Sequence, residues 1–466
     1  MEKANTEKKN FKHRLLNILF WSVVSAAFIG PGTVTTVTKA GAYFHYDLMW
    51  TILFSIFACY ILQEASVRVT IYSGMNLGKA ISVYFANSKG RGVILFLITM
   101  AIILGSAAYE TGNILGSVEG LHFVFGHVNK IYFVILIGFF AFLAFSMRSI
   151  RSIAQWMGAF VFLMGIAFLT TAIFVNPDYS AILKGSLVPK IPDVPGAGIL
   201  ILGIIGTTVV PYDLFLGSGI VDKSHTMKDA RIGLAVAIVM GGIITMSIMA
   251  VGSAITEGMT DKAIANMDFS FDLIKNILYL NALIGETAVY IFGFGMFAAG
   301  FTSAITAPLA SAITAKSIFA KEDDKKWANN SFYYYLITIG ILSVGLFFGL
   351  IQIKPIPAII AAQAFNGLIL PFISIFLIII INDPRVMKGR INSWKSNILM
   401  ITVVWLTTVI GLLNIVKATA KAFGKTLPSP DTLFAIIALA GVLISAWVMY
   451  YVVKNRKREY TEFKEN

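Results

Sequence analysis

Charged residues are scarce in this chain. Only 13% of its 466 residues are Asp, Glu, Lys or Arg, whereas soluble globular domains carry about 25%. Hydrophobic residues make up 57%. This composition excludes an ordinary soluble enzyme and indicates an all-α, polytopic protein of the cytoplasmic membrane, with the lipid bilayer as its solvent.

Groups that commonly carry chemistry are also few. The single cysteine, Cys59, lies in an apolar segment, which excludes a disulfide framework and a thiolate metal site. The five histidines form no two-His cluster, and no G-x-x-x-x-G-K-[ST] motif occurs. We therefore expect no enzymatic activity, no cofactor and no ATP-driven pumping. The short polar loops also argue against a sensor or scaffold with a large soluble domain.

The net charge of +13 reflects topology rather than nucleic-acid binding. Most of the 37 Lys and Arg residues fall on one side of the expected spans, including both terminal tails. This asymmetry is a positive-inside signal and places both termini in the cytoplasm.

Apolar runs predict about twelve transmembrane helices. The first covers 18–44 and the sixth covers 197–221, and each is interrupted by proline and glycine or polar residues. Because five helices separate the interruptions, we expect a 5+5 inverted repeat with two extra helices. The predicted parts are a basic tail (1–17), a transporter core (18–381, with repeats 18–175 and 197–381), two further helices (382–453) and a tail (454–466). Between the interrupted helices and after them, spans are expected at 48–72, 92–122, 131–146, 153–175, 231–255, 282–316, 332–351, 356–381, 396–416 and 431–453.

The two interruptions predict the substrate site. Gly30-Pro31-Gly32-Thr33 breaks the first helix, and Thr207 to Asp213, with Val210, Pro211 and Tyr212 between them, breaks the sixth. Unwinding frees carbonyls that bind cations and amides that attract anionic groups. A proline kink used only for packing is the alternative, and Asp213 could instead cap a half-helix.

Other polar residues inside apolar helices are candidate functional groups. Glu110 and Asn113 share one face and suit proton carriage, unless Glu110 pairs with Arg68. Glu64 and Arg68 are better explained as a structural ion pair. Thr302 and Ser303, with Thr306, could line a small cation site or simply bond to helical carbonyls. Gln363 and Asn366 could contact substrate or bond between helices.

Several segments resemble the NRAMP family of proton-coupled divalent-metal transporters, over residues 18 to 415. The matching segments are Leu62-Gln63 with Arg68 and Gly74, Ala108–Asn113 with Gly116-Ser117, Lys184–Pro189, Gly206–Leu216, Ala299-Gly300 with Ser303, and Gln363 followed by Leu370-Pro371-Phe372. The resemblance implies the LeuT-like fold and a divalent cation of the Mn, Fe or Mg class as substrate.

The resemblance fails at the metal ligands. The family's Asp-Pro-Gly-Asn motif reads Gly30-Pro31-Gly32-Thr33 here, and its Met-Pro-His motif reads Val210-Pro211-Tyr212. Of the ligand positions, which fall on Gly30, Thr33, Thr207, Val210 and Gln363, only Gln363 and the Thr207 carbonyl are kept, so no intact metal site is expected. The proton-route Asp and Glu of the third helix correspond to Glu110 and Asn113.

These residues predict a secondary active transporter that works by alternating access. Gly30, Thr33, Thr207, Val210, Tyr212 and Gln363 are expected to bind the substrate, with Glu110, Asn113 and Asp213 as candidates for proton coupling. The loss of the carboxylate disfavours a dehydrated transition metal, whereas a hydrated Mg²⁺ stays possible. The alternative is H⁺- or Na⁺-coupled uptake of a small organic anion or amino-acid-like solute.

Overall fold

The structure is a computed structural model, and it describes residues 20–147, 150–194, 196–221, 226–280, 285–320, 324–328, 331–422, 427 and 429–464. The described part of the chain is helical and contains no strand. An unlabelled helix, Phe20–Phe28, comes first. The labelled helices are α2 Pro31–Phe44, α3 Met49–Ser73, α4 Leu77–Tyr84, α5 Arg91–Val124, α6 Lys130–Phe145, α7 Ile150–Phe174, α8 Tyr179–Leu187, α9 Ala197–Thr208, α10 Pro211–Ile220, α11 Met227–Ile255, α12 Asp261–Ala265, α13 Phe271–Leu280, α14 Gly285–Phe319, α15 Phe332–Leu350, α16 Pro355–Ile380, α17 Trp394–Ala422 and α18 Pro430–Lys464.

The helices match the expected spans. Among the described residues, ten stretches are long and apolar enough to cross a membrane, counting α9 and α10 together. The pair Phe20–Phe28 and Pro31–Phe44 adds an eleventh as one bent span. The expected span 131–146 corresponds to α6, which is apolar but has only 16 residues. A count of twelve therefore depends on α6 crossing the bilayer, for which about 20 residues are typical.

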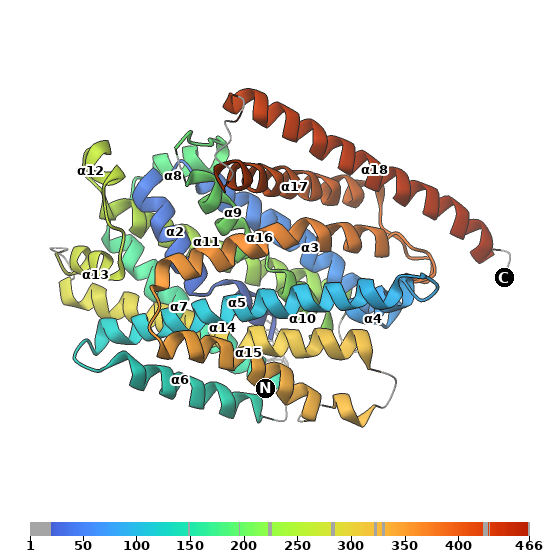
Figure 1. Cartoon of the computed structure of the whole chain (residues 1–466), viewed down its shortest axis with the longest axis horizontal. Coiled ribbons are helices and arrows are strands. Elements are labelled where there is room, and N and C mark those ends of the chain that lie inside the picture. The colour runs from blue at the N-terminus through green and yellow to red at the C-terminus, as the bar shows by residue number, and fades with distance from the viewer. Residues whose placement is uncertain are drawn as a thin grey trace, which may run out of the picture.

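The short helices that the sequence did not predict gather at the two ends of the bundle. Figure 1 shows α8, α12 and α13 at one end, and α4 with the C-terminal end of α18 at the other. The long helices run between these ends, and α17 and α18 lie along one flank. The described helices thus form a bundle of long apolar helices with short helices at both ends.

Small residues let the central helices approach closely. A Cβ atom on Gly41 of α2 would lie 2.3 Å from the Met249 carbonyl oxygen of α11, and one on Gly252 would lie 2.3 Å from the Thr38 carbonyl oxygen. Backbones in direct contact are typical of membrane helices, where packing replaces the hydrophobic effect. Helix α2, the second half of the first broken helix, is thereby fixed against α11.

Candidate functional site

The first break separates two half-helices that meet at 54°. Ile29 and Gly30 lie between them, and Pro31 takes the first helical position of α2, where its missing N–H costs no hydrogen bond. The Pro31 ring fills a notch: a Cβ atom on Gly116 or Gly300 would lie 2.0 Å or 2.9 Å from its ring carbons. The break is therefore held by α5 and α14. A break is present as predicted, but it covers Ile29 and Gly30, and the rest of the predicted segment 30–33 is the first turn of α2.

The second break lies between α9 and α10. Val209 and Val210 separate Thr208, the last residue of α9, from Pro211, the first of α10. Neither Val210 nor Gly30 caps its half-helix with a side-chain hydrogen bond. No side chain therefore caps the N-terminal end of α2 or α10, and at α10 the Asp213 N–H bonds to the Val210 carbonyl instead (3.1 Å).

The last three carbonyls of the first half-helix are occupied by hydroxyl groups from three different elements. An unpaired carbonyl inside a bilayer costs several kcal/mol, so these bonds stabilise the break. The donors are Ser303 Oγ to Ala26 (3.1 Å), Tyr212 Oη to Ala27 (3.1 Å) and Thr33 Oγ1 to Phe28 (2.6 Å).

A direct contact joins the two breaks. Thr33 Oγ1 lies 2.8 Å from Thr207 Oγ1. At the residue before Thr207, the Tyr109 hydroxyl donates to the Gly206 carbonyl at 2.7 Å. The Tyr109 ring packs edge-on against Tyr212, with centroids 5.6 Å apart. The sequence analysis gives Tyr109 no role, although a phenol inside an apolar helix indicates that its hydroxyl needs a hydrogen-bond partner.

Glu110 reaches the first break through Asn113. Asn113 Nδ2 donates to Glu110 Oε2 at 3.2 Å, while Asn113 Oδ1 lies 3.4 Å from where a Cβ atom on Gly30 would be. Arg68, the alternative partner for Glu110, pairs with Glu64 instead (3.1 Å). Glu110 Oε1 is buried and makes no hydrogen bond, so this acid keeps one oxygen for a proton.

Asp213 does not cap α10. Its Oδ2 accepts a 2.7 Å hydrogen bond from Gln63 Nε2 of α3, and Oδ1 is buried without a hydrogen-bond partner. Ser66, one turn further along α3, donates to the Leu214 carbonyl at 2.6 Å. Gln63 therefore joins the site, and its position in an apolar helix next to Glu64 was the available signal.

Of the remaining candidates, Gln363 and Ser303 contact the first break, whereas Asn366 and Thr302 bond to helical carbonyls elsewhere. The Gln363 amide lies over Gly32, where a Cβ atom would be 1.7 Å from Nε2. Asn366 instead donates to the Gly105 carbonyl of α5 at 3.5 Å, which is the interhelical role. Thr302 donates to the Ala299 carbonyl within its own helix (3.1 Å), so of the two helix α14 candidates only Ser303 contacts the break.

The whole site is buried and poor in carboxylates. Thr33 and Thr207 are 0% exposed, and Tyr212 and Gln363 are 1% exposed. Among the residues that the structure describes, no three His, Cys, Asp or Glu side chains come together as a metal site. The polar groups around the breaks are hydroxyls, amides and carbonyls, which are hard oxygen donors.

The expected Glu64–Arg68 ion pair is present, and Arg231 joins it as a third member. Glu64 Oε2 lies 3.1 Å from Arg68, and Oε1 lies 2.8 Å from Arg231 of α11. One carboxylate thus joins α3 to α11.

Comparison of the sequence with known protein families identifies the family of this chain. Residues 22–417 match the family described as "natural resistance-associated macrophage protein-like". The chain belongs to this NRAMP family. The Staphylococcus saprophyticus protein named "Divalent metal cation transporter MntH" is 26% identical over 427 residues, which cover 88% of this chain and 93% of that protein. The Klebsiella pneumoniae protein of the same name is 25% identical over 62% of this chain and 69% of its own length.

Solved structures confirm the predicted LeuT-like, all-α fold. The Eremococcus coleocola manganese transporter superposes with a TM-score of 0.68 at 19% identity, over 96% of both chains. A Na⁺-coupled sialic acid symporter superposes with a TM-score of 0.56 at 13% identity, over 92% of this chain and 88% of that one. At these identities the likeness concerns the fold. Like its MntH relatives, this NRAMP protein is a membrane transporter and not an enzyme.

Proposed function

We propose that this NRAMP protein is a secondary active transporter that carries a divalent metal cation across the cytoplasmic membrane by alternating access around its two helix breaks. Two relatives named as divalent metal cation transporters and a fold shared with a manganese transporter support a cation as cargo. Within the 5+5 repeat, the breaks correspond to the place where such folds hold their substrates.

The observation that carries the proposal is the contact between Thr33 and Thr207. Their hydroxyl oxygens lie 2.8 Å apart and connect the two broken helices at a fully buried point. Each hydroxyl oxygen has two lone pairs and one hydrogen. Thr33 can therefore keep its bond to the Phe28 carbonyl while its oxygen accepts a cation or a water of its hydration shell. Gly30, Tyr212 and Gln363 complete the proposed site.

The chemistry of the donors limits the form of the cation. A bare divalent ion would lie in a low-dielectric site without a neutralising carboxylate, which costs several kcal/mol or more. Val210 brings no thioether, the soft ligand that favours soft transition metals. Neutral oxygens fit a hard cation that keeps part of its water shell, such as Mg²⁺ or Mn²⁺.

Proton coupling is proposed for Glu110, with Asn113 as its link to the first break. The bond from Asn113 to Glu110 and the position of Asn113 Oδ1 beside Gly30 let a change at the break reach the acid. Asp213, held by Gln63, is the second candidate. Ser303 is proposed to hold the Ala26 carbonyl by its hydrogen bond, rather than to form a separate cation site with Thr302.

The proposed orientation has both termini in the cytoplasm. The basic segment around α4 and the C-terminal end of α18 lie at the same end of the bundle (Figure 1). Positive charge retained on one side is what the positive-inside rule expects of the cytoplasmic face.

Calorimetry on the purified protein tests this function. Titration with Mg²⁺ or Mn²⁺ is expected to give saturable binding that Thr33→Val weakens. A panel of small carboxylates and amino acids is expected to give no heat of binding. Saturable binding of a carboxylate together with silence toward every divalent cation would overturn the proposal.

A further inference from the structure

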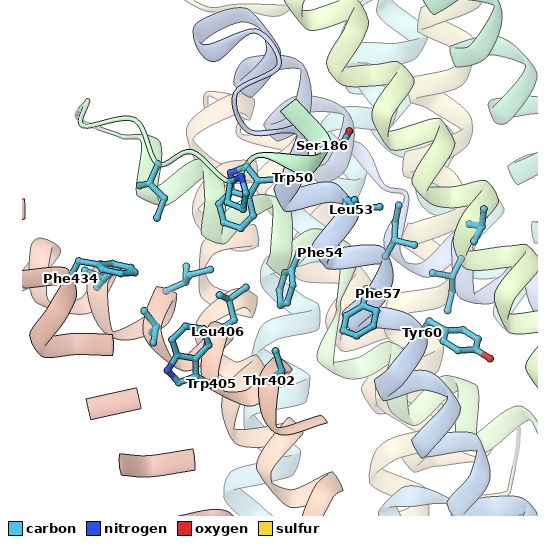
Figure 2. A pocket seen from close by; sticks show the side chains of 18 of the residues that line it. Trp50, Leu53, Phe54, Phe57, Tyr60, Ser186, Thr402, Trp405, Leu406 and Phe434 are labelled. Atoms are coloured by element: carbon cyan, nitrogen blue, oxygen red, sulfur yellow. The ribbon is translucent and has the colours of Figure 1, made fainter. Parts of the chain in front are cut away.

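A prominent groove in the described part of the chain lies away from the helix breaks. It encloses about 930 Å³ between α3, α11, α17 and α18. Figure 2 shows Trp50, Phe54 and Phe57 of α3 along one side and Trp405 and Leu406 of α17 along the other. Its polar lining is limited to hydroxyl and indole groups such as those of Ser186, Tyr60 and Thr402. A groove of this kind takes an apolar ligand.

The groove has a polar end and an apolar interior. At the polar end, the Trp50 indole N–H donates to the Lys190 carbonyl at 2.9 Å. The Lys190 side chain is 62% exposed and pairs with Asp47 at 2.5 Å. An ammonium group has three hydrogens, so Lys190 keeps donors for a second anionic partner. Trp and Lys are the residues that mark the interface between bilayer and water.

The length of the groove fits one leaflet. Along α3 it extends from Trp50 to Tyr60, and ten residues at 1.5 Å each give about 15 Å. The hydrocarbon core of a bilayer is about 30 Å thick, so one leaflet supplies chains of about 15 Å. With Trp50 at the interface, the other end at Tyr60 lies near the bilayer midplane.

We propose that this groove is a binding site for one phospholipid, whose acyl chain fills the space between α3 and α17 and whose phosphate lies at Lys190. In the orientation proposed above, this lipid comes from the outer leaflet. The proposal requires the chain to span a membrane but does not depend on the identity of the cargo.

The groove lies between a helix that is bonded to the second break and the two helices outside the repeat, so a lipid in it would pack between them. One wall, α3, is bonded to α10 of the second break through Gln63 and Ser66. The other wall, α17, is joined to α18 by a 3.3 Å bond from the Trp405 indole to the Ala438 carbonyl. The acyl chain would therefore fill the space between a helix attached to the site and the two helices outside the repeat.

Fluorescence quenching tests the site on the full-length protein in detergent. A phosphatidylglycerol with a dibrominated acyl chain quenches tryptophans that it contacts. We expect saturable quenching whose amplitude falls in Trp50→Phe and in Trp405→Phe. Trp447→Phe is the matched control, because Trp447 is 62% exposed on α18 and lies outside the groove, so its removal should leave the saturable part unchanged.

A groove-filling variant makes the test independent of the tryptophans. Val239 lines the groove from α11 and is 49% exposed, so Val239→Phe fills space without entering the core. We expect the half-saturating lipid concentration to rise at least fivefold. Val344→Phe, at an exposed valine of α15 outside the groove, should leave it unchanged. Native mass spectrometry should show one retained phospholipid that Val239→Phe loses.

Three results would overturn the proposal. They are quenching that never saturates, equal loss of quenching in Trp447→Phe and Trp50→Phe, and a stable dimer whose formation Val239→Phe abolishes. The last result would mean that a second copy of the chain covers the groove.

Discussion

The Tyr212 hydroxyl donates a 3.1 Å hydrogen bond to the Ala27 carbonyl oxygen. This bond joins α10 of the second broken helix to the last turn of the half-helix Phe20–Phe28 of the first. Tyr212 and Ala27 are both at most 1% exposed. A carbonyl that could bind a cation is therefore satisfied by a side chain of the protein itself, and the two breaks are held in one arrangement.

Replacing Tyr212 by Phe removes this bond and leaves the Ala27 carbonyl buried without a donor. We expect a loss of about 1–3 kcal/mol in stability, seen as a lower thermal unfolding temperature in detergent, together with slower transport. Tyr334→Phe is the control, because the Tyr334 bond to the Phe145 carbonyl is longer (3.4 Å) and lies on α15. Equal effects of the two variants would contradict a special role for Tyr212.

The Thr33–Thr207 contact predicts non-additive effects on cation binding. Thr33→Val and Thr207→Val should each weaken binding measured by calorimetry, and the double variant should lose less than the sum, because the hydroxyls act as a pair. Thr35→Val is a matched control on the same helix. Thr35 is also fully buried, but its hydroxyl makes no hydrogen bond, so its removal should be neutral or slightly stabilising. Strict additivity would show that the two hydroxyls act separately.

Restoring a carboxylate at the first break should change the metal preference. A Cβ atom at Gly30 would lie 2.8 Å from Ser303 Oγ, so Gly30→Asp needs Ser303→Ala to make room. We expect the double variant to bind Mn²⁺ at least tenfold more tightly than Ser303→Ala alone, about 1.4 kcal/mol, because an anionic ligand offsets dehydration of the ion. Unchanged affinity would mean that Gly30 does not face the cargo.

The Glu64 bridge predicts a structural rather than a transport defect. Glu64→Gln leaves Arg68, which is 7% exposed, without its carboxylate partner, and breaking such a pair costs about 3 kcal/mol. Glu119→Gln should cost less, because its partner Lys130 is 34% exposed and water replaces the lost interaction. Thermal unfolding of both variants measures the difference. Normal stability of Glu64→Gln would contradict the bridge.

The sequence predicted the all-α fold and the presence of two broken helices, whereas the substrate site at these breaks stays a prediction. Apolar runs and the prolines at 31 and 211 identified the spans and both breaks, because backbone groups in a bilayer must be satisfied locally. The partners of the polar groups could not be predicted. Whether Asp213 caps α10 or bonds to Gln63, and whether Glu110 pairs with Arg68 or Asn113, depends on how helices far apart in sequence rotate against each other. The short helices α8 and α13 were not predicted, because the search for apolar runs finds only helices long enough to cross a membrane, and these have 9 and 10 residues.

Uptake of Mn²⁺ and Mg²⁺ into proteoliposomes under an inward proton gradient tests the central claim most directly. The account predicts uptake well above that of protein-free liposomes, unchanged in Thr35→Val and lost in the Thr33→Val/Thr207→Val double variant. No uptake of any divalent cation by the wild-type protein, or full uptake by the double variant, would contradict it.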